Sequence, residues 1–109
     1  MIGANREDIS SSQYLVNIHG ITNSSTPHFD LEEEYANQRQ VQMLIREGVL
    51  NSAHDLSEGG LWVGLLEKGF ASGLGFDITL PAEFRKDAVL FGEAASRILV
   101  TVSEENKDK

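Results

Sequence analysis

Residues 51–61 read NSAHDLSEGGL and place several side chains that can do chemistry directly ahead of a glycine pair. His54 could act as an acid, a base or a metal ligand, and Asp55 could hold a divalent cation. Gly59 and Gly60 would let an anion approach the free backbone amides at the start of a helix. The same pattern also fits an ordinary helix cap in which glycine lets two backbones pack closely. The residues alone leave both interpretations open.

Three further features of this segment bear on the choice. Ser57 can cap the helix that follows, with Glu58 in or next to its first turn. A lone His between Ala53 and Leu56 is more often a hydrogen-bonded structural residue than a ligand. No second His stands at ligand spacing from His54, so the sequence predicts no zinc site.

A second group of candidate residues, LFGEAASR at 90–97, leads directly into the apolar run ILVTV. Glu93 and Arg97 are therefore expected near the end of a strand, where ligands of layered folds often bind. An ion pair between these two side chains that fixes the turn is the alternative. Neither interpretation is favoured by the residues themselves.

The sequence contains no motif for independent catalysis. It has no phosphate-binding P-loop, no dinucleotide-binding glycine motif and no serine in a nucleophile-elbow pattern. We therefore predict no catalytic residue in this chain.

The composition suits one domain, or part of one, in a reducing compartment. The chain has 109 residues, 40% of them hydrophobic, and no cysteine, so disulfides and thiolate zinc sites are excluded. The N-terminus lacks the apolar centre of a signal peptide, and no apolar run approaches the roughly 20 residues that span a bilayer. We expect a cytoplasmic protein that does not enter a membrane.

The charge balance restricts the ligands. Seventeen acidic and nine basic residues give a formal net charge of -8. Such a surface repels phosphates and argues against nucleic-acid binding, which depends on Lys and Arg displacing counterions. A phosphorylated ligand would have to be met by backbone amides, a divalent metal or a few placed basic residues.

Local patterns define most of the secondary structure. Asp30 and Glu33 have capping-box spacing, the segment FDITL alternates with period two, and ILVTV is rich in β-branched residues. The segment after Ser57 is apolar on nearly every side, which indicates a mostly buried helix. The predicted elements are a short helix at 13–18, a loop at 20–29, a helix from Asp30 to about Gly48, a helix from about Glu58 to Phe70, a strand at 76–80, a helix at 83–91 and a strand at 98–102.

These elements indicate an α+β fold built from α/β layers, with irregular ends at 1–9 and 104–109. Only two strands are predicted, and a two-stranded sheet is rarely stable alone. We therefore expect residues 1–109 to form a single partial domain. The missing strands would come from further chain or from a partner, and exposed strand edges could also pair two copies into a homo-oligomer.

The two candidate segments together resemble a known family. SAHDLSEGGLWVGLLEKGF, followed by LFGEAASRILVTVSEEN, resembles the C-terminal half of the large subunit of phosphoribosylformylglycinamidine synthase, in the aminoimidazole ribonucleotide synthetase superfamily. Upstream, REDISSSQYLVNIHG and FDLEEEYANQRQVQMLIREGVLNSAHD resemble the matching parts of the same family. The resemblance spans roughly residues 5 to 106.

The resemblance implies a fragment of an ATP-dependent ligase of purine biosynthesis, inactive when isolated. The family converts the amide of formylglycinamide ribonucleotide into an amidine, with ammonia from a glutaminase subunit or domain. The fold implied is an incomplete three-layer C-terminal domain, whose partners would be the remainder of the synthetase chain, the glutaminase and the small ribonucleotide. A nucleotide-binding or purely structural module of the same superfamily is the alternative function.

The resemblance also implies cofactors and site residues. His-Asp before Ser-x-Gly-Gly is typical of the second half of the family's enzyme, where a pseudo-symmetric site holds a structural nucleotide. ATP or ADP with Mg is the cofactor of the complete enzyme. Position by position, Asp55 becomes the expected metal ligand and Glu93 an expected ligand-binding residue. Together with the candidates from the residue pattern, the expected ligand-binding residues are Ser57, Glu58, Gly59, Gly60, Glu93 and Arg97.

Two departures from the family pattern weaken the implied pocket. Residues 93–97 read Glu-Ala-Ala-Ser-Arg where the family usually has Glu-Ser-Gln-x-Arg, and residues 10–13 read Ser-Ser-Ser-Gln in place of Gly-Gly-Ser-Glu. Both changes remove polar or flexible groups and favour a weakened or purely structural pocket. The family's ATP-binding domain and catalytic His correspond to no part of this sequence.

Overall fold

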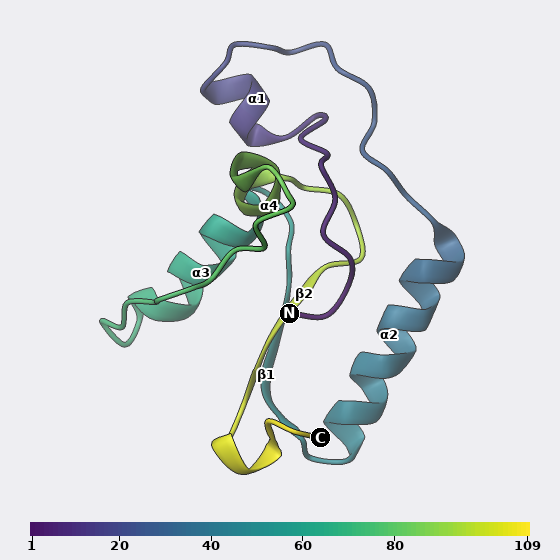
Figure 1. Ribbon diagram of the computed structural model, residues 1–109, viewed down its shortest axis with the longest axis vertical. Coiled ribbons are helices and arrows are strands. Elements are labelled where there is room, and N and C mark those ends of the chain that lie inside the picture. The colour runs from purple at the N-terminus through teal and green to yellow at the C-terminus, as the bar shows by residue number, and fades with distance from the viewer.

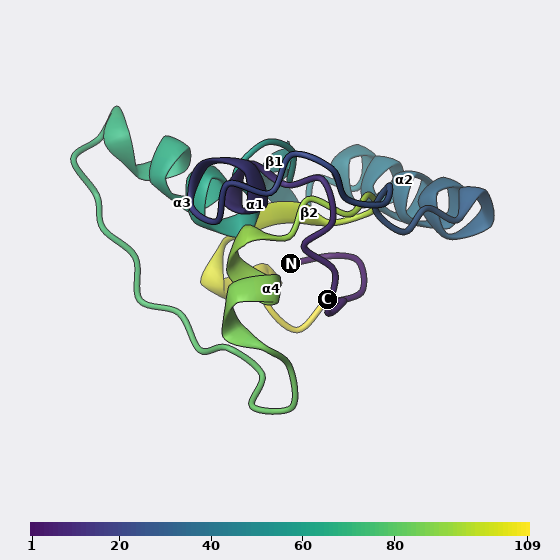
Figure 2. The ribbon, with the colours of Figure 1, turned by 90° about the horizontal axis from the view of Figure 1, so that it is seen from above.

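The structure, a computed structural model, describes residues 1–109 and has the predicted α+β class (Figure 1). Four helices, two strands and a final 3-10 turn follow one another along the chain. They are α1 (Gln13–Asn17), α2 (Leu31–Arg46), β1 (Leu50–Asp55), α3 (Gly60–Phe70), α4 (Lys86–Phe91), β2 (Ile98–Val102) and η1 (Glu104–Asn106). Figures 1 and 2 both place α2 and α3 on opposite sides of the strand pair.

The α2 helix forms where local signals predict it. The Asp30 side chain accepts a hydrogen bond from the Glu33 amide at 2.8 Å, which satisfies one free donor of the first turn. Acidic residues in the first turn and Arg46 in the last complement the helix dipole. The helix buries Val41 against the rest of the molecule and leaves its outer side in solvent.

Strands β1 and β2 form a two-stranded antiparallel sheet. Ser52 lies opposite Thr101, His54 opposite Leu99, and Asp55 opposite Ile98. No strand was predicted at 50–55, so β1 is an element that the sequence did not indicate. The segment LNSAHD has no β-branched residue, so its strand conformation comes from pairing with β2 and not from local preference.

The predicted strand at 76–80 does not form. The segment runs beside the core without regular structure, and Phe76 and Ile78 are each 37% exposed. Its alternating pattern gives the segment an apolar side, but a strand also needs a neighbour to pair with. Beyond β1, the strand β2 pairs only through a single bridge between Ile98 and Ile2 and not with 76–80. An alternating segment without an adjacent strand stays unpaired.

Helix α3 begins at Gly60, two residues later than predicted. Its N-cap is Gly59, in the left-handed region with φ of 80°, and no side chain caps it. The predicted Ser57 cap is therefore wrong. The prediction of burial on nearly every side is also wrong, because Trp62 is 40% and Phe70 72% exposed.

The core is small and lies where α3, α4 and β2 meet. Leu56, Leu61 and Val89 are its buried centre. A β-carbon at Gly60 would lie 2.6 Å from the carbonyl oxygen of Gly92, so glycine is required where α3 meets the end of α4. None of the helices combines the length and the apolar character that a membrane span requires.

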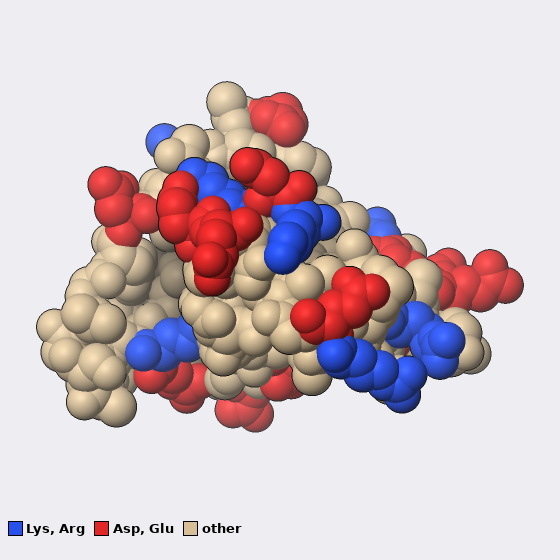
Figure 3. Space-filling view, turned by 90° about the horizontal axis from the view of Figure 1, so that it is seen from below, with Lys and Arg blue, Asp and Glu red and all other residues tan.

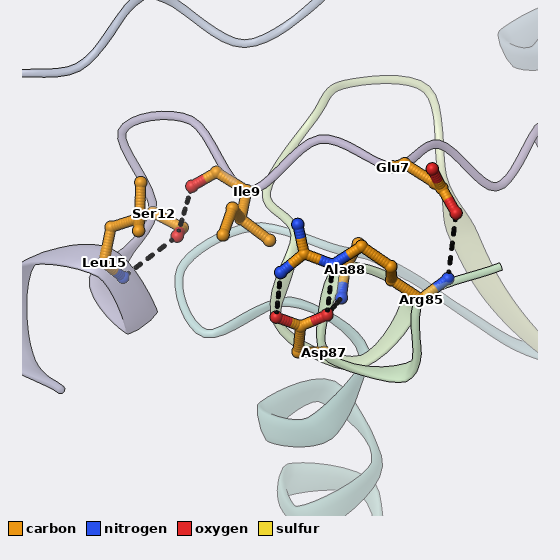
Figure 4. A network of polar contacts seen from close by, with 7 residues as sticks. All are labelled: Glu7, Ile9, Ser12, Leu15, Arg85, Asp87 and Ala88. Atoms are coloured by element: carbon orange, nitrogen blue, oxygen red, sulfur yellow. Dashed lines mark hydrogen bonds and ion pairs between the residues drawn. The ribbon is translucent and has the colours of Figure 1, made fainter. Parts of the chain in front are cut away.

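The N-terminal segment is tied to α1 and α4 by polar contacts (Figure 4). The Ser12 hydroxyl donates to the carbonyl of Ile9 at 2.6 Å and accepts from the amide of Leu15 at 3.2 Å, which caps α1. The amide of Arg85 donates to the Glu7 carboxylate at 3.1 Å. These contacts place α1 beside α4.

Candidate functional site

A cavity of about 500 Å³ opens between α2, the end of β1 and the segment before β2. Because Asp55 pairs with Ile98, the two candidate segments of the sequence meet at this point. Its lining consists of Glu34, Gln38, Asp55, Leu56, Ser57, Glu93, Ala95, Ser96, Arg97 and Ile98. Asp55, Ser57, Glu93 and Arg97 were candidates from sequence.

Asp55 is the free carboxylate of the cavity. It is the last residue of β1, its side chain is exposed, and it makes no ion pair within the chain. No group of three His, Asp or Glu side chains is arranged to hold a metal. A cation at Asp55 would therefore complete its coordination with water and ligand oxygens, which is the mode Mg²⁺ prefers.

Glu93 has one oxygen engaged and caps a helix. Its Oε2 accepts a hydrogen bond from the Gln13 amide at the start of α1, where a carboxylate complements the helix dipole. The ion pair with Arg97 that the sequence left open does not form. Glu93 thus lines the cavity and anchors α1 at once.

The Arg97 guanidinium faces inward and is not free for a ligand, which corrects the expectation from sequence. The residue is 4% exposed. Its guanidinium donates to the carbonyl of Val89 at 2.8 Å and to that of Gly92, near the end of α4. Burial lowers the pKa of Arg97 from its ordinary value. This side chain supports the cavity wall by satisfying carbonyls that the helix end leaves unpaired.

The start of α3 lies outside the cavity, which is a second correction. Glu58, Gly59 and Gly60 are absent from its lining. Gly60 is pressed against the carbonyls of Leu90 and Gly92, so the glycines serve close packing of α3 on α4. The structure therefore supports the second interpretation of the glycine pair, in which glycine lets two backbones pack closely.

Three polar residues of the lining were not predicted from the sequence: Glu34 and Gln38 on α2, and Ser96. The Ser96 hydroxyl donates to Glu34 Oε2, and the Gln38 amide donates to Glu34 Oε1 at 2.7 Å. These two hydrogen bonds, the one from Ser96 first, lower the pKa of Glu34. Ser96 itself has a positive φ of 71°, and the Asn37 side chain donates to its carbonyl at 3.1 Å.

A sequence signal for the α2 residues existed. Glu34, Asn37 and Val41 follow one another at three- and four-residue steps, so they share one side of the helix. Val41 is buried, which turns that side toward the sheet. The acidic first turn was interpreted only as a solvated helix end.

His54 lies on the other side of the sheet from Asp55, since successive strand residues alternate. Its Nε2 lies 3.3 Å from Glu67 Oε2 on α3. His54 therefore joins β1 to α3 and takes no part in the cavity. This position agrees with the structural interpretation of a lone His.

The cavity is acidic in character. Its ionisable side chains are the carboxylates Glu34, Asp55 and Glu93, and the Arg97 guanidinium, which is bonded to α4. Bare phosphate would meet like charge here, whereas a metal-bound phosphate or a hydroxyl-rich ligand would find acceptors and a cation ligand. The fold and the cavity together define an α+β domain with an acidic cavity.

Comparison with known proteins assigns the family. The family described as AIR synthase related protein, C-terminal domain, matches residues 2–109, and the chain belongs to this family. This result confirms the resemblance found in the sequence and the incomplete α+β domain that it implied.

Similar proteins include several described as phosphoribosylformylglycinamidine synthase subunit PurL. The one from Salinibacter ruber is 52% identical over 97 residues, which are 88% of this chain and 13% of the relative. Those from Alkaliphilus metalliredigens and Moorella thermoacetica are 42% and 40% identical, over 97% and 100% of this chain and 14% and 15% of their own lengths. The chain thus spans about one seventh of the relatives it matches.

Proposed function

We propose that this chain is a C-terminal-type domain, from the second half, of an ATP-dependent phosphoribosylformylglycinamidine synthase acting in the cytoplasm in purine biosynthesis. It supplies scaffold and a pocket for Mg-bound nucleotide phosphate, and it is inactive alone. The identity to the synthase subunits over nearly the whole chain supports this proposal. The remaining domains of the synthetase, a glutaminase that supplies ammonia, and the small ribonucleotide substrate are its partners.

The observation that carries the proposal is the free Asp55 carboxylate in a cavity that also contains Ser57 and Glu93. Asp55 would hold Mg²⁺, which would neutralise charge that otherwise repels the phosphates of ATP or ADP from the acidic wall. The Ser57 hydroxyl would donate to a phosphate oxygen. The second oxygen of Glu93 can accept from a ligand hydroxyl.

A second candidate is a structural domain without a ligand. It is favoured by the engagement of Arg97 with the α4 carbonyls and of Glu93 with the α1 amide. In this case the open edges of the two-stranded sheet would pair with neighbouring domains or with another copy.

Thermal unfolding with and without millimolar Mg-ADP separates the two candidates. A ligand that binds only the folded chain raises the midpoint, by about 4–8 °C for each kcal/mol of binding linkage in a domain of this size. We expect an increase with Mg-ADP and none with ADP in EDTA. An unchanged midpoint at millimolar Mg-ADP would favour the second candidate, the structural domain without a ligand.

Replacing the metal ligand tests the site itself. Asp55→Ala should abolish the Mg-dependent increase and leave the midpoint of the free chain within about 4 °C, because an exposed side chain contributes little to folding. Asp77→Ala, an exposed acid remote from the cavity, is the matched control and should keep the full increase. Equal Mg-ADP stabilisation of Asp55→Ala and wild type would remove Asp55 from the site.

A further inference from the structure

Residues 9–29 form a stretch without charge in a strongly charged chain. Asp, Glu, Lys and Arg make up 24% of the sequence, yet none of them falls between Ile9 and Phe29. The stretch contains α1 and the loop that follows it. Free surfaces of soluble domains normally carry interspersed charges, so this stretch is unusual for a surface that faces only water.

The stretch exposes several large apolar side chains among Ser, Thr, Asn and Gln residues. Helix α1 buries Leu15, but Val16 is 37% exposed, Ile18 71% and Ile21 45%. Apolar side chains gathered on an uncharged surface mark an interaction site more often than scattered ones do.

A row of aromatic rings extends this surface from α1 across α4 to α3. The rings of Tyr14 and Phe91 stack with centroids 4.8 Å apart, Phe91 and Trp62 lie 6.3 Å apart, and Trp62 meets Phe76 edge-on at 5.4 Å. Trp62 is 40% and Phe76 37% exposed. Figure 1 shows α1, α4 and α3 following one another down the side of the molecule away from α2.

We define the uncharged face as residues 9–29 together with the rings of Phe91, Trp62 and Phe76. The exposed apolar residues of α2 differ from it, since Leu31 and Met43 alternate there with Glu32, Arg39 and Arg46. Figure 3, the view from below, shows acidic and basic side chains interspersed over the middle and right of the molecule. The run from Ile9 to Phe29 contains no such side chain.

We propose that the uncharged face is the surface on which this domain docks against the rest of the synthetase chain. The centres of protein interfaces are depleted of charged residues and enriched in Tyr, Trp and Phe, and the aromatic row of this face has that composition. The inference rests on the proposed function, in which the matched relatives have about six sevenths of their length outside this region. The surface that covers it is expected to be apolar and uncharged as well, with aliphatic groups between the rings.

A second copy of this chain fits the face less well. Each copy carries a formal net charge of -8, so two copies repel each other at low salt whichever faces meet. A neighbouring domain of the same polypeptide has no such restriction and is held nearby by the chain itself.

The test uses a chimera in which this chain replaces the matching 97-residue segment of the Salinibacter ruber relative. Ile18→Asp is introduced into the free chain and into the chimera. Because Ile18 is 71% exposed, the free chain should keep its midpoint within about 3 °C. In the chimera a buried unpaired carboxylate should lower synthase activity at least about tenfold.

Met43→Asp on the outer side of α2 is the matched control, since Met43 is also exposed, at 51%. It should leave the chimera's activity within about twofold of the unaltered chimera. Hydrogen exchange gives a second measurement. Amides of 13–21 should exchange more slowly in the chimera than in the free chain, whereas those on the outer side of α2 should not.

Each remaining outcome is decisive. An active chimera that tolerates Ile18→Asp, or that leaves exchange at 13–21 as in the free chain, would overturn the docking face. If the free chain dimerises and Ile18→Asp abolishes the dimer, the face binds a second copy of this chain instead. An unaltered chimera without synthase activity would count against the proposed function, and exchange at 13–21 would still decide the docking face.

Discussion

Asp55 and Arg97 both line the cavity, but only Asp55 has its charged group free. Asp55 ends a strand at the surface, where water can solvate its carboxylate. The Arg97 guanidinium is buried and bonded to the carbonyls of Val89 and Gly92. A buried charge is tolerated when its hydrogen bonds are satisfied, so Arg97 has a structural role. Of the two, only the exposed Asp55 carboxylate is free to contact a ligand.

Removing the Arg97 guanidinium should therefore destabilise the domain. Arg97→Met leaves two buried carbonyls without donors, which costs about 2–4 kcal/mol in the free energy of unfolding, measured by urea titration. Arg39→Met, at an exposed arginine without an ion pair, is the control and should change it by less than about 0.5 kcal/mol. Equal effects of the two substitutions would contradict the role of Arg97.

Glu34 predicts a pH dependence of stability. Hydrogen bonds from Ser96 and then Gln38 lower the pKa of Glu34, so the folded state holds this proton less tightly than the unfolded state. The resulting stability is present above the ordinary glutamate pKa of about 4.3 and is lost as pH falls through the lower folded value.

Ser96→Ala removes the larger of these two hydrogen bonds. The free energy of unfolding of this variant should fall less steeply than that of wild type as pH drops from about 5 to 3, because less of the stability depends on ionised Glu34. Urea titrations at a series of pH values measure the two slopes. Parallel slopes would show that the contact with Ser96 does not hold the pKa of Glu34 down.

Elements fixed by local signals were predictable, and those fixed by distant partners were not. Helix α2 follows from the cap at Asp30 and the acidic residues of its first turn. Strand β1 depends on β2, which lies more than 40 residues further along the chain, and nothing within LNSAHD indicates it. A strand was predicted at 76–80 but does not form, for the same reason: a strand needs a neighbour to pair with as well as an alternating pattern.

The packing of α3 on α4 gives the element-scale prediction. Gly60 and Gly73 have nearly equal positive φ angles, 62° and 64°, but a β-carbon meets backbone only at Gly60. Gly73→Ala should therefore cost about 1 kcal/mol from the backbone conformation alone. Gly60→Ala should cost about 3 kcal/mol or more, because α3 must also move away from the carbonyls of Leu90 and Gly92.

Unfolding free energies of the two alanine variants provide the comparison. Gly60→Val, with a β-branched side chain at a helix start, should be more destabilising still. Equal costs for the two alanine variants would mean that the α3 and α4 backbones are not in the close contact described above.

At the scale of the whole molecule, the chain buries few of its residues. Fourteen of 109 residues are buried, the sheet has two strands, and fifteen large hydrophobic side chains are exposed. Such a domain gains much of its stability from what covers it, which agrees with a chain that spans about one seventh of its relatives. In our two proposals, the cavity binds a ligand and the uncharged face contacts the neighbouring domain.

The candidate site was predictable only in part for the same reason. Asp55, Ser57 and Glu93 come from the two segments that the sequence singled out, and the pairing of β1 with β2 brings them together. The spacing of Glu34 and Val41 puts them on one side of α2, but only the tertiary position of α2 brings Glu34 to the cavity. The glycine pair, for which the sequence left an anion site and close packing both open, allows close backbone packing at Gly60.

The central claim is that Mg-bound nucleotide phosphate occupies the cavity at Asp55. Amide chemical shifts of the ¹⁵N-labelled chain, followed while Mg-ADP is added, test it most directly. We predict saturable shifts at Asp55, Ser57 and Ser96 that disappear in EDTA, with the α2 amides near Arg39 unchanged. Shifts centred away from the cavity, or a spectrum that does not change at millimolar Mg-ADP, would contradict the account.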